Sequence, residues 1–566
     1  MKTQVTKQHN DTFGISLAKK TITLRSVVVA LVVVLATLGY AGAQIGGPWT
    51  PLTNTPSFGA DMALLLTDGT VMVHDSANTS NWWRLTPDQY GSYINGKWSA
   101  LAPLPSGYCP WAFASAVLKD GRVIVEGGED NYCGSGAGES TLGAIFDPTV
   151  VVTGKMIGKW KPVVPPEDPP GSPWTTIGDA PSVVLANGTF MLGNCCTSIN
   201  DQMDALLTGD PTKSSPNPWT PTGLLTIQAE NNNEEGWTLL PDGSVLKING
   251  AWAVPWTSGD ASERYLPPPV GAWTPAGALC ADLFQHTSSY GEIGPAILRP
   301  DGTVFATGSN AYGAGHTCIY HTSPSDPDYL TWTSGPDFQN GLDMADGPAV
   351  LLPNGNVLVA ASPGFYAPPA SFYEFDLTNN WNPVLAPGNV PTRNNDSSES
   401  IRMLPLPTGQ VLFMDGSSDV EIYTPSNRVY DPSWAPQISG SPFQSGQIYN
   451  NLPNQISGLQ FNGMSQAAAF GDEFQSATNY PLVRITTWGI FGKPGEVYYC
   501  RTHNHTSMGV QTGNLTVSTF FDCPDVPTGT FGSLQVVANG IPSNPVWVSV
   551  VAGCVPPTYC PPNIVE

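Results

Sequence analysis

The chain has 566 residues, of which 41% are hydrophobic and only 12% are charged, with 59 glycines and 55 prolines. This composition is typical of a turn-rich, all-β protein, and it excludes a disordered or mainly helical chain. The formal net charge of −23 argues against nucleic acid and anionic membranes as partners and favours cations or neutral substrates such as sugars. The alternative interpretation is that the acidic charge only keeps an exported protein soluble.

The N-terminus has the order of a secretory signal peptide. A basic segment ending at Arg25 precedes the apolar run 26–38, and small residues follow it before Gln44. This order predicts a signal peptide over 1–43, cleaved near Ala43, and therefore a secreted protein, extracellular or periplasmic. The apolar run is short for a membrane span, and an uncleaved anchor is the alternative.

Seven short turns divide most of the remaining chain. Each has glycine at its second position and lies between two apolar arms, as in ALLLTDGTVMV and AILRPDGTVFA. This pattern predicts tight β-hairpins, because such turns need positive φ. The turns are Asp68-Gly69, Asp120-Gly121, Asn187-Gly188, Asp242-Gly243, Asp301-Gly302, Asn354-Gly355 and Thr408-Gly409. Their spacing of 52 to 67 residues is near that of kelch-type blades and predicts a seven-bladed β-propeller over 44–436.

Tryptophans repeat in step with the turns, and one turn falls in each interval between them. They are Trp49, Trp98, Trp160, Trp219, Trp273, Trp332, Trp381 and Trp434. We expect them to pack between blades rather than to form a sugar-stacking surface. A strand near Trp49 is expected to complete the sheet of the last blade, which removes an open edge. Since a propeller encloses a channel, function is expected at the ends of that channel.

After Trp434 the pattern changes to short alternating strands. A link rich in Pro, Gly and Ser (436–447) is followed by runs of period two such as LVRITTW and LTVSTFF. About 120 residues of such strands predict an immunoglobulin-like β-sandwich over 437–553. Residues 554–566 form a Pro-rich tail.

Export makes the ten cysteines candidates for disulfides. Proximity in sequence favours the pairs Cys109–Cys133, Cys500–Cys523 and Cys554–Cys560. Cys195 and Cys196 form either a vicinal disulfide or two separate disulfides with Cys280 and Cys318. No CxxC motif occurs in the sequence, which argues against a thiolate zinc site.

A signal peptide, a kelch-like propeller and a terminal β-sandwich together resemble the galactose oxidase/glyoxal oxidase family. The stretch Cys500–Met508, CRTHNHTSM, looks like the Thr-His-Thr loop of that family, which carries a copper ligand into the channel. The resemblance implies a copper ion held by this loop, by a Tyr-His pair and by a Tyr linked to Cys, whose radical oxidises alcohols or aldehydes. His503 and His505 are the matching candidate metal ligands.

The other copper positions are not matched. Counting back from the glycine turns places Glu399-Ser400 where the family has its Tyr-His pair and Asp179 where it has the cross-linked Tyr. Ala112 falls at the Cys position, with Cys109 three residues earlier. Loss of both tyrosines removes the radical, so the sequence favours an inherited fold with a degenerate copper site. An active copper oxidoreductase acting on alcohols, aldehydes or sugars, with displaced ligands including Tyr108 and Cys109, is the alternative.

Acidic residues stand at the start of the inner strands in six of the seven predicted blades. They are Asp61, Asp179, Glu234, Glu235, Glu292, Asp346 and Glu399. Three interpretations remain open. In the first, the carboxylates cap backbone N–H groups. In the second, the carboxylates and the two histidines bind a divalent cation through O and N ligands. In the third, a pair among Asp179, Glu234 and Glu399 performs acid/base catalysis on a glycan.

These patterns favour a secreted, monomeric propeller that binds a carbohydrate or other small polar ligand, a divalent cation, or both, at an acidic channel mouth. The copper-dependent oxidoreductase is one alternative. The other is a protein–protein interaction scaffold with an inert channel, since one propeller fold serves many functions.

Overall fold

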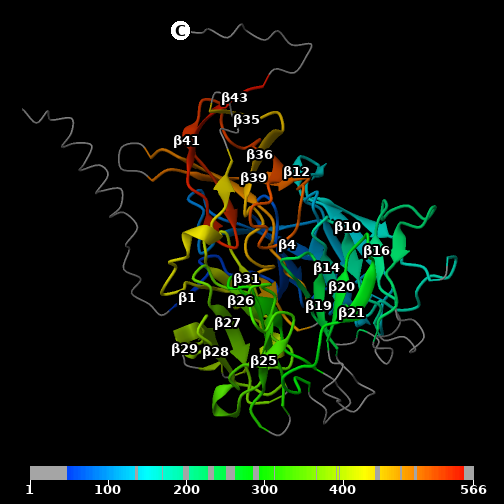
Figure 1. Cartoon of the computed structure of the whole chain (residues 1–566). Coiled ribbons are helices and arrows are strands. Elements are labelled where there is room, and N and C mark those ends of the chain that lie inside the picture. The colour runs from blue at the N-terminus through cyan, green and yellow to red at the C-terminus, as the bar shows by residue number, and fades with distance from the viewer. Residues whose placement is uncertain are drawn as a thin grey trace, which may run out of the picture. The chain divides into compact units, whose positions relative to one another are not determined.

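The structure is a computed structural model (Figure 1). It describes residues 48–133, 138–168, 170–195, 203–226, 232, 235–249, 262–284, 292–310, 313–364, 366–389, 392–393, 395–439, 446–471, 474–489 and 494–553. The predicted signal peptide, the Pro-rich tail and Glu234 lie outside these residues. Within them, the chain is all-β, and its helices are the 3₁₀ turns η1 (Gln339–Gly341), η2 (Pro387–Asn389), η3 (Ser398–Ser400) and η4 (Pro432–Trp434). The described part of the chain contains no helix with the length and hydrophobicity needed to span a membrane.

Seven antiparallel sheets form the blades, as the repeat predicts; six have four strands, and the sheet of the sixth blade has six. The first four blades, each from its inner strand outward, are β2 (Ala60–Leu65), β3 (Val71–Asp75), β4 (Trp82–Thr86), β5 (Lys97–Ala100); β7 (Ala114–Val117), β8 (Val123–Glu126), β10 (Gly143–Asp147), β13 (Lys159–Val163); β14 (Ser182–Val184), β15 (Phe190–Leu192), β16 (Ala205–Leu207), β17 (Trp219–Pro221); and β18 (Trp237–Leu239), β19 (Val245–Ile248), β20 (Ser262–Leu266), β21 (Ala272–Pro275).

The remaining blades complete the ring. They are β22 (Ala296–Leu298), β23 (Thr303–Thr307), β24 (Thr317–His321), β25 (Trp332–Ser334); β26 (Ala349–Leu351), β27 (Val357–Ala361), β28 (Ala370–Phe375), β29 (Trp381–Val384); and β31 (Arg402–Pro405), β32 (Val411–Met414), β33 (Glu421–Tyr423) with β1 (Trp49–Pro51). Strand β30 (Thr392–Arg393) pairs with β28 of the sixth blade. Outside the blades lie the short strands β6 (Pro110–Trp111), β9 (Asp130–Asn131), β11 (Val151–Val152) and β12 (Lys155–Met156). Each inner strand contacts the next, and β2 contacts both β7 and β31, so the ring of inner strands is closed.

The seven predicted turns join the first two strands of each blade. Their glycines have φ between +73° and +88°, a conformation that favours glycine. In the six Asx-Gly turns the side chain also accepts a hydrogen bond from the backbone two residues later, for example from Thr70 N to Asp68 Oδ1 at 3.0 Å. Because the turn residues satisfy their own backbone, the local sequence is sufficient to fix these hairpins.

The repeated tryptophans tie successive blades together, as predicted. The indole N–H of Trp160, in the second blade, donates to Ala102 O after the first blade at 3.0 Å. Trp219 makes the equivalent bond to Val164 O at 2.6 Å. Trp49 on β1 pairs with Tyr423 on β33, which confirms that the N-terminal strand closes the last blade.

The C-terminal strands form a nine-stranded sheet. Its members are β34 (Gln437–Ile438), β36 (Asn454–Leu459), β40 (Val517–Asp522), β39 (Val497–His503), β38 (Leu482–Thr487), β41 (Phe531–Ala538), β43 (Val546–Val551), β35 (Gln447–Tyr449) and β42 (Ile541–Pro542). Figure 1 shows β36, β39, β41 and β43 gathered together in yellow to red. Strand β39 pairs with β38 at its start and with β40 at its end, so it joins two halves that share one apolar core.

A segment between these strands runs through the propeller channel. We call residues 464–480, without 472 and 473, the channel segment. Its strand β37 (Ala468–Ala469) pairs with β26 of the sixth blade. Gln466 Oε1 accepts from Leu239 N of the fourth blade at 2.7 Å, and Ser115 Oγ of the second blade donates to Gln475 O at 2.9 Å. The segment therefore contacts inner strands on several sides of the channel.

The described cysteines are all disulfide-bonded. Two predicted pairs, Cys109–Cys133 and Cys500–Cys523, are confirmed. Cys280 pairs with Cys318, which excludes the alternative in which they bond to Cys195 and Cys196. The predicted pair Cys554–Cys560 lies outside the described residues.

Candidate functional site

A cavity of about 440 Å³ lies where the inner strands begin. Five of the seven predicted acidic residues line it: Asp61, Asp179, Glu292, Asp346 and Glu399. They converge because each precedes or opens the inner strand of its blade; Asp346 lies three residues before β26, and Asp179 three before β14. Ala112 and Ser400, which stand at two positions of the family's copper centre, line the same cavity. Counting back from the turns thus located the channel mouth.

Arg402 carries the positive charge of the cavity lining. Its Cζ lies 4.2 Å from the ring centre of Phe470 and 3.9 Å from that of Phe474, both on the channel segment. Its Nη1 donates to the backbone oxygens of Glu399 and Ile401. A guanidinium held between two aromatic rings in a largely desolvated position is strongly attracted by both rings. The channel segment therefore fixes the orientation of Arg402 in the cavity.

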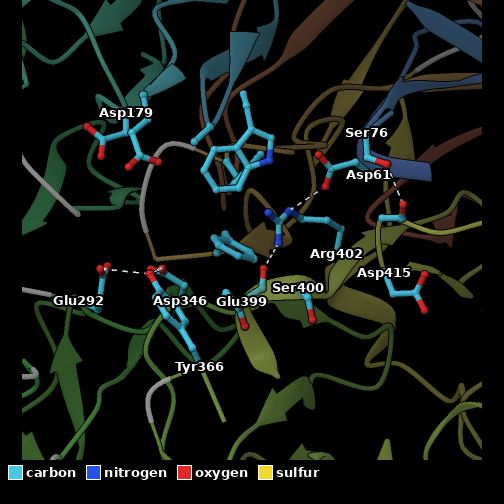
Figure 2. A pocket seen from close by; sticks show the side chains of 16 residues that line it. Asp61, Ser76, Asp179, Glu292, Asp346, Tyr366, Glu399, Ser400, Arg402 and Asp415 are labelled. Atoms are coloured by element: carbon cyan, nitrogen blue, oxygen red, sulfur yellow. Dashed lines mark hydrogen bonds and ion pairs between the residues drawn. The ribbon is translucent and has the colours of Figure 1, made fainter. Parts of the chain in front are cut away.

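Asp61 is paired with this guanidinium. Its Oδ1 lies 3.5 Å from Arg402 Nε (Figure 2). Its Oδ2 lies 3.9 Å from His74 Nδ1. Burial raises the pKa of the Asp61 carboxyl, but the charge of Arg402 and the nearby His74 ring outweigh it, so that the pKa is lowered below its usual value. Asp61 is therefore ionised at neutral pH.

A second group of acids meets at Tyr366. The phenol oxygen lies 3.1 Å from Glu292 Oε1 and 3.3 Å from Asp346 Oδ2, and Figure 2 shows the three side chains together on one side of the cavity. The phenol has one hydrogen, so it donates to one carboxylate at a time. Two carboxyl groups thus share one donor beside the open cavity.

The lining as a whole is strongly acidic. Besides the five predicted acids it includes Glu129 and Asp415, against the single guanidinium of Arg402. Burial and the nearby Asp179 carboxylate raise the pKa of the adjacent Glu139 to about 7. Such a field attracts cations, disfavours anions and offers many acceptors to hydroxyl groups.

Several lining residues were not predicted. Glu129 and Asp415 follow the second strands β8 and β32, which return to the same end of the channel. Counting forward from the turns as well as back locates these two acids. Trp111 lies on the short strand β6 outside the blades, and Tyr366 and the aromatic pair of the channel segment lie in loops; none of these segments has a periodic signal.

Glu235 does not line the cavity. It is fully buried with Lys247, and Glu235 Oε2 lies 3.1 Å from Lys247 Nζ. Lys247 Nζ also donates to Asn232 Oδ1 at 2.7 Å. This pair is buried in the fourth blade, where the two charges compensate each other.

The two histidines of the Thr-His-Thr-like loop lie near the turns at the other end of the inner strands. His505 N donates to Lys119 O beside the Asp120-Gly121 turn. Burial lowers the pKa of His505 to about 3, and its Nδ1 lies 2.9 Å from Thr519 Oγ1. His503 Nε2 is paired with Asp522 Oδ2 at 3.2 Å. Neither histidine lines the cavity.

The described residues do not fit the family's copper centre. Cys109 is bonded to Cys133, so its sulfur cannot form a thioether with a tyrosine. The hydroxyl of Tyr108 is buried and donates to Gly127 O at 3.0 Å. Among the residues that the structure describes, no group of three or more His, Cys, Asp or Glu side chains has the geometry to hold a metal ion.

Comparison with protein-family models gives no match. Comparison with curated proteins gives no significant match. Among solved structures, an extracellular domain assigned to a hybrid two component system of B. thetaiotaomicron aligns with 90% of this chain at 9% identity and a TM-score of 0.41. This chain covers only 59% of that one.

Two smaller structures align with about two thirds of the chain. The calcium structure of a Trichoderma reesei protein of Carbohydrate-Active Enzymes Family AA12 covers 67% of this chain and 98% of its own at 11% identity, with a TM-score of 0.29. The periplasmic gluconolactonase of Pseudomonas aeruginosa covers 65% of this chain and 97% of its own at 12% identity, with a TM-score of 0.31. Similarities this weak say nothing about ligand or activity.

Proposed function

We propose that this protein is an exported, galactose-oxidase-like propeller that binds a carbohydrate in its acidic cavity and has lost the copper centre of that family. Export is supported by the signal-peptide pattern of the sequence and by three disulfides among the described residues, which persist in oxidising compartments. We assign the C-terminal strands to the immunoglobulin-like sandwich of the family, since their two halves share one apolar core.

The observation that carries this proposal is the composition of the cavity wall. A volume of about 440 Å³ lies within the range of small-molecule sites. The wall combines carboxylates and a fixed guanidinium with the ring of Trp111, which is 36% exposed. Sugars need this combination, because their hydroxyl groups donate and accept hydrogen bonds while their C–H faces pack on aromatic rings.

The charge of the wall selects among sugars. The carboxylates of Glu292 and Asp346 accept hydrogen bonds from hydroxyl or ammonium groups, whereas they repel a uronate or a sulfate ester. The ligand we propose is therefore a neutral or amino sugar, and acidic saccharides are excluded.

Glycan-array screening followed by calorimetric titration tests this function. The saccharide that binds best is titrated into the wild type, Trp111→Ala, Asp346→Asn and the control Tyr90→Ala, whose side chain is exposed outside the cavity. We expect both cavity variants to weaken binding at least tenfold, about 1.4 kcal/mol, and the control to leave it unchanged. Equal affinities in all four proteins exclude the cavity as the site.

A further inference from the structure

A second surface with a distinct composition lies on the C-terminal sheet. Four aromatic side chains there are exposed, while the other large apolar side chains of the same strands are mostly buried. Their exposed fractions are 40% for Tyr449, 61% for Trp488, 60% for Phe531 and 62% for Trp547. We call these four residues the aromatic face. None of them lines the cavity.

The strand register brings these residues to one side of the sheet. Phe531 is opposite Ser549, and Ser533 is opposite Trp547, so the outward positions of β41 and β43 carry both aromatic rings. At the alternate positions of these strands, Leu534 and Val548 point into the core. The face continues onto β35, because that strand runs parallel to β43 and Tyr449 is opposite Val551. Strands β35, β41 and β43 lie together at one end of the sheet in Figure 1.

Trp488 extends the face beyond the end of β38. Its backbone N donates to Phe531 O at 3.4 Å. Its ring centre lies 5.7 Å from that of Trp547, and the two planes cross at 79°. The two exposed indoles therefore pack edge to face, and this contact orients both rings although neither is buried.

The size of the face fits a chain-like ligand better than a protein. Large aromatic side chains bury about 150–250 Å² each, so four of them at these exposed fractions offer on the order of 400 Å². A stable protein interface needs about 800 Å² from each partner. A patch of several hundred Å² is nevertheless of the size that marks functional surfaces.

The charge of the aromatic face and of the whole chain restricts the class of ligand further. The register positions between the aromatic rings are the uncharged Ser533 and Ser549. The chain as a whole has a formal net charge of −23, which opposes contact with a second copy or with anionic lipid. The remaining partner of matching chemistry is an uncharged polymer with flat C–H faces and hydroxyl groups.

We infer that the aromatic face binds a flat, uncharged polysaccharide of the chemistry of cellulose or chitin. The sugar rings stack on the exposed indoles, and their hydroxyl groups reach the serines between them. This inference extends the proposed carbohydrate binding to a second surface but does not depend on the cavity. It gives the protein a means of attachment to an insoluble glycan.

Depletion from solution by microcrystalline cellulose and by chitin, each used alone, tests the inference. We compare the wild type, the double variant Trp488→Ala/Trp547→Ala and the cavity variant Trp111→Ala. The wild type and the cavity variant are expected to bind at least one of the two polymers, with at least tenfold loss in the double variant. Because both indoles are mostly exposed, the double variant is expected to keep the wild-type circular dichroism spectrum and melting temperature.

Three results overturn the inference: no retention of the wild type on either polymer, equal retention of the double variant, or a dimer in sedimentation that the double variant converts to monomer. The last result identifies the face as an interface between copies. Failure of the cavity proposal looks different, since soluble saccharides then bind equally to the wild type and Trp111→Ala while polymer retention still depends on the two exposed indoles.

Discussion

Replacement of Arg402 by methionine removes the guanidinium that is packed between Phe470 and Phe474 and paired with Asp61. Methionine keeps much of the apolar volume and contacts the two rings favourably through its sulfur. The loss of folding stability is mainly electrostatic, because Asp61 is only 5% exposed and keeps its charge. Removing one partner of a buried ion pair costs about 3–5 kcal/mol.

Urea unfolding followed by circular dichroism measures this loss, with Asp61→Asn/Arg402→Met as the second variant. The amide has no charge to compensate, so we expect the double variant to regain about half of the lost free energy of unfolding. With the single variant Asp61→Asn included, the coupling energy between the two sites is expected to be at least about 2 kcal/mol, within the range of contacting residues.

Arg122→Met is the matched control. Arg122 Nη2 lies 2.7 Å from Asp120 Oδ2, but both side chains are about one third exposed. An exposed ion pair contributes about 0–1 kcal/mol, so this variant is expected to remain close to the wild type. If Arg402→Met costs no more than Arg122→Met, or if the Asp61 and Arg402 substitutions are additive, the account of the cavity charge is refuted.

Three further predictions concern pH, metal content and disulfides. Burial raises the pKa of Asp343 to about 6, so the folded state holds this proton longer than the unfolded state does, and stability is lost as the pH rises from about 4 to 6. Asp343→Asn is therefore expected to be about 2–3 kcal/mol more stable than the wild type at pH 8 and equally stable below pH 4. Urea unfolding at both pH values checks this prediction. A stability difference that does not change with pH contradicts it. Elemental analysis of protein purified without chelator is expected to give no stoichiometric copper, because Cys109 is bonded to Cys133 and both histidines lie away from the cavity; one copper per chain defeats this prediction. Replacing Cys109 and Cys133 by serine opens a loop with a sequence separation of 24 and is expected to cost about 3 kcal/mol in the same unfolding assay, whereas an unchanged midpoint shows that this loop does not constrain the unfolded chain.

The blades and the channel mouth were predictable because their signals are local. Asp68-Gly69 and its equivalents fix hairpins with their own backbone and side chains. Because every inner strand starts at the same end of the channel, the residues at those starts lie close together. Counting back from the turns therefore predicted that Asp61, Asp179 and Asp346 would meet at the channel mouth.

The features that were not predicted depend on distant segments. Arg402 meets Phe470 and Phe474 only because the channel segment passes through the ring. Glu235 was expected at the mouth, but it is paired with the buried Lys247 of the same blade, and a residue count cannot reveal that pairing. The aromatic face likewise needs the register between β41 and β43, which no sequence period specifies.

The most direct test of the proposed function is a crystal structure of the protein soaked with the saccharide that binds best on the array. The account predicts one ordered sugar against Trp111, with hydroxyl groups within hydrogen-bonding distance of Glu292 and Asp346. Ordered sugar found only outside this cavity, or only water within it at saturating ligand, contradicts the account.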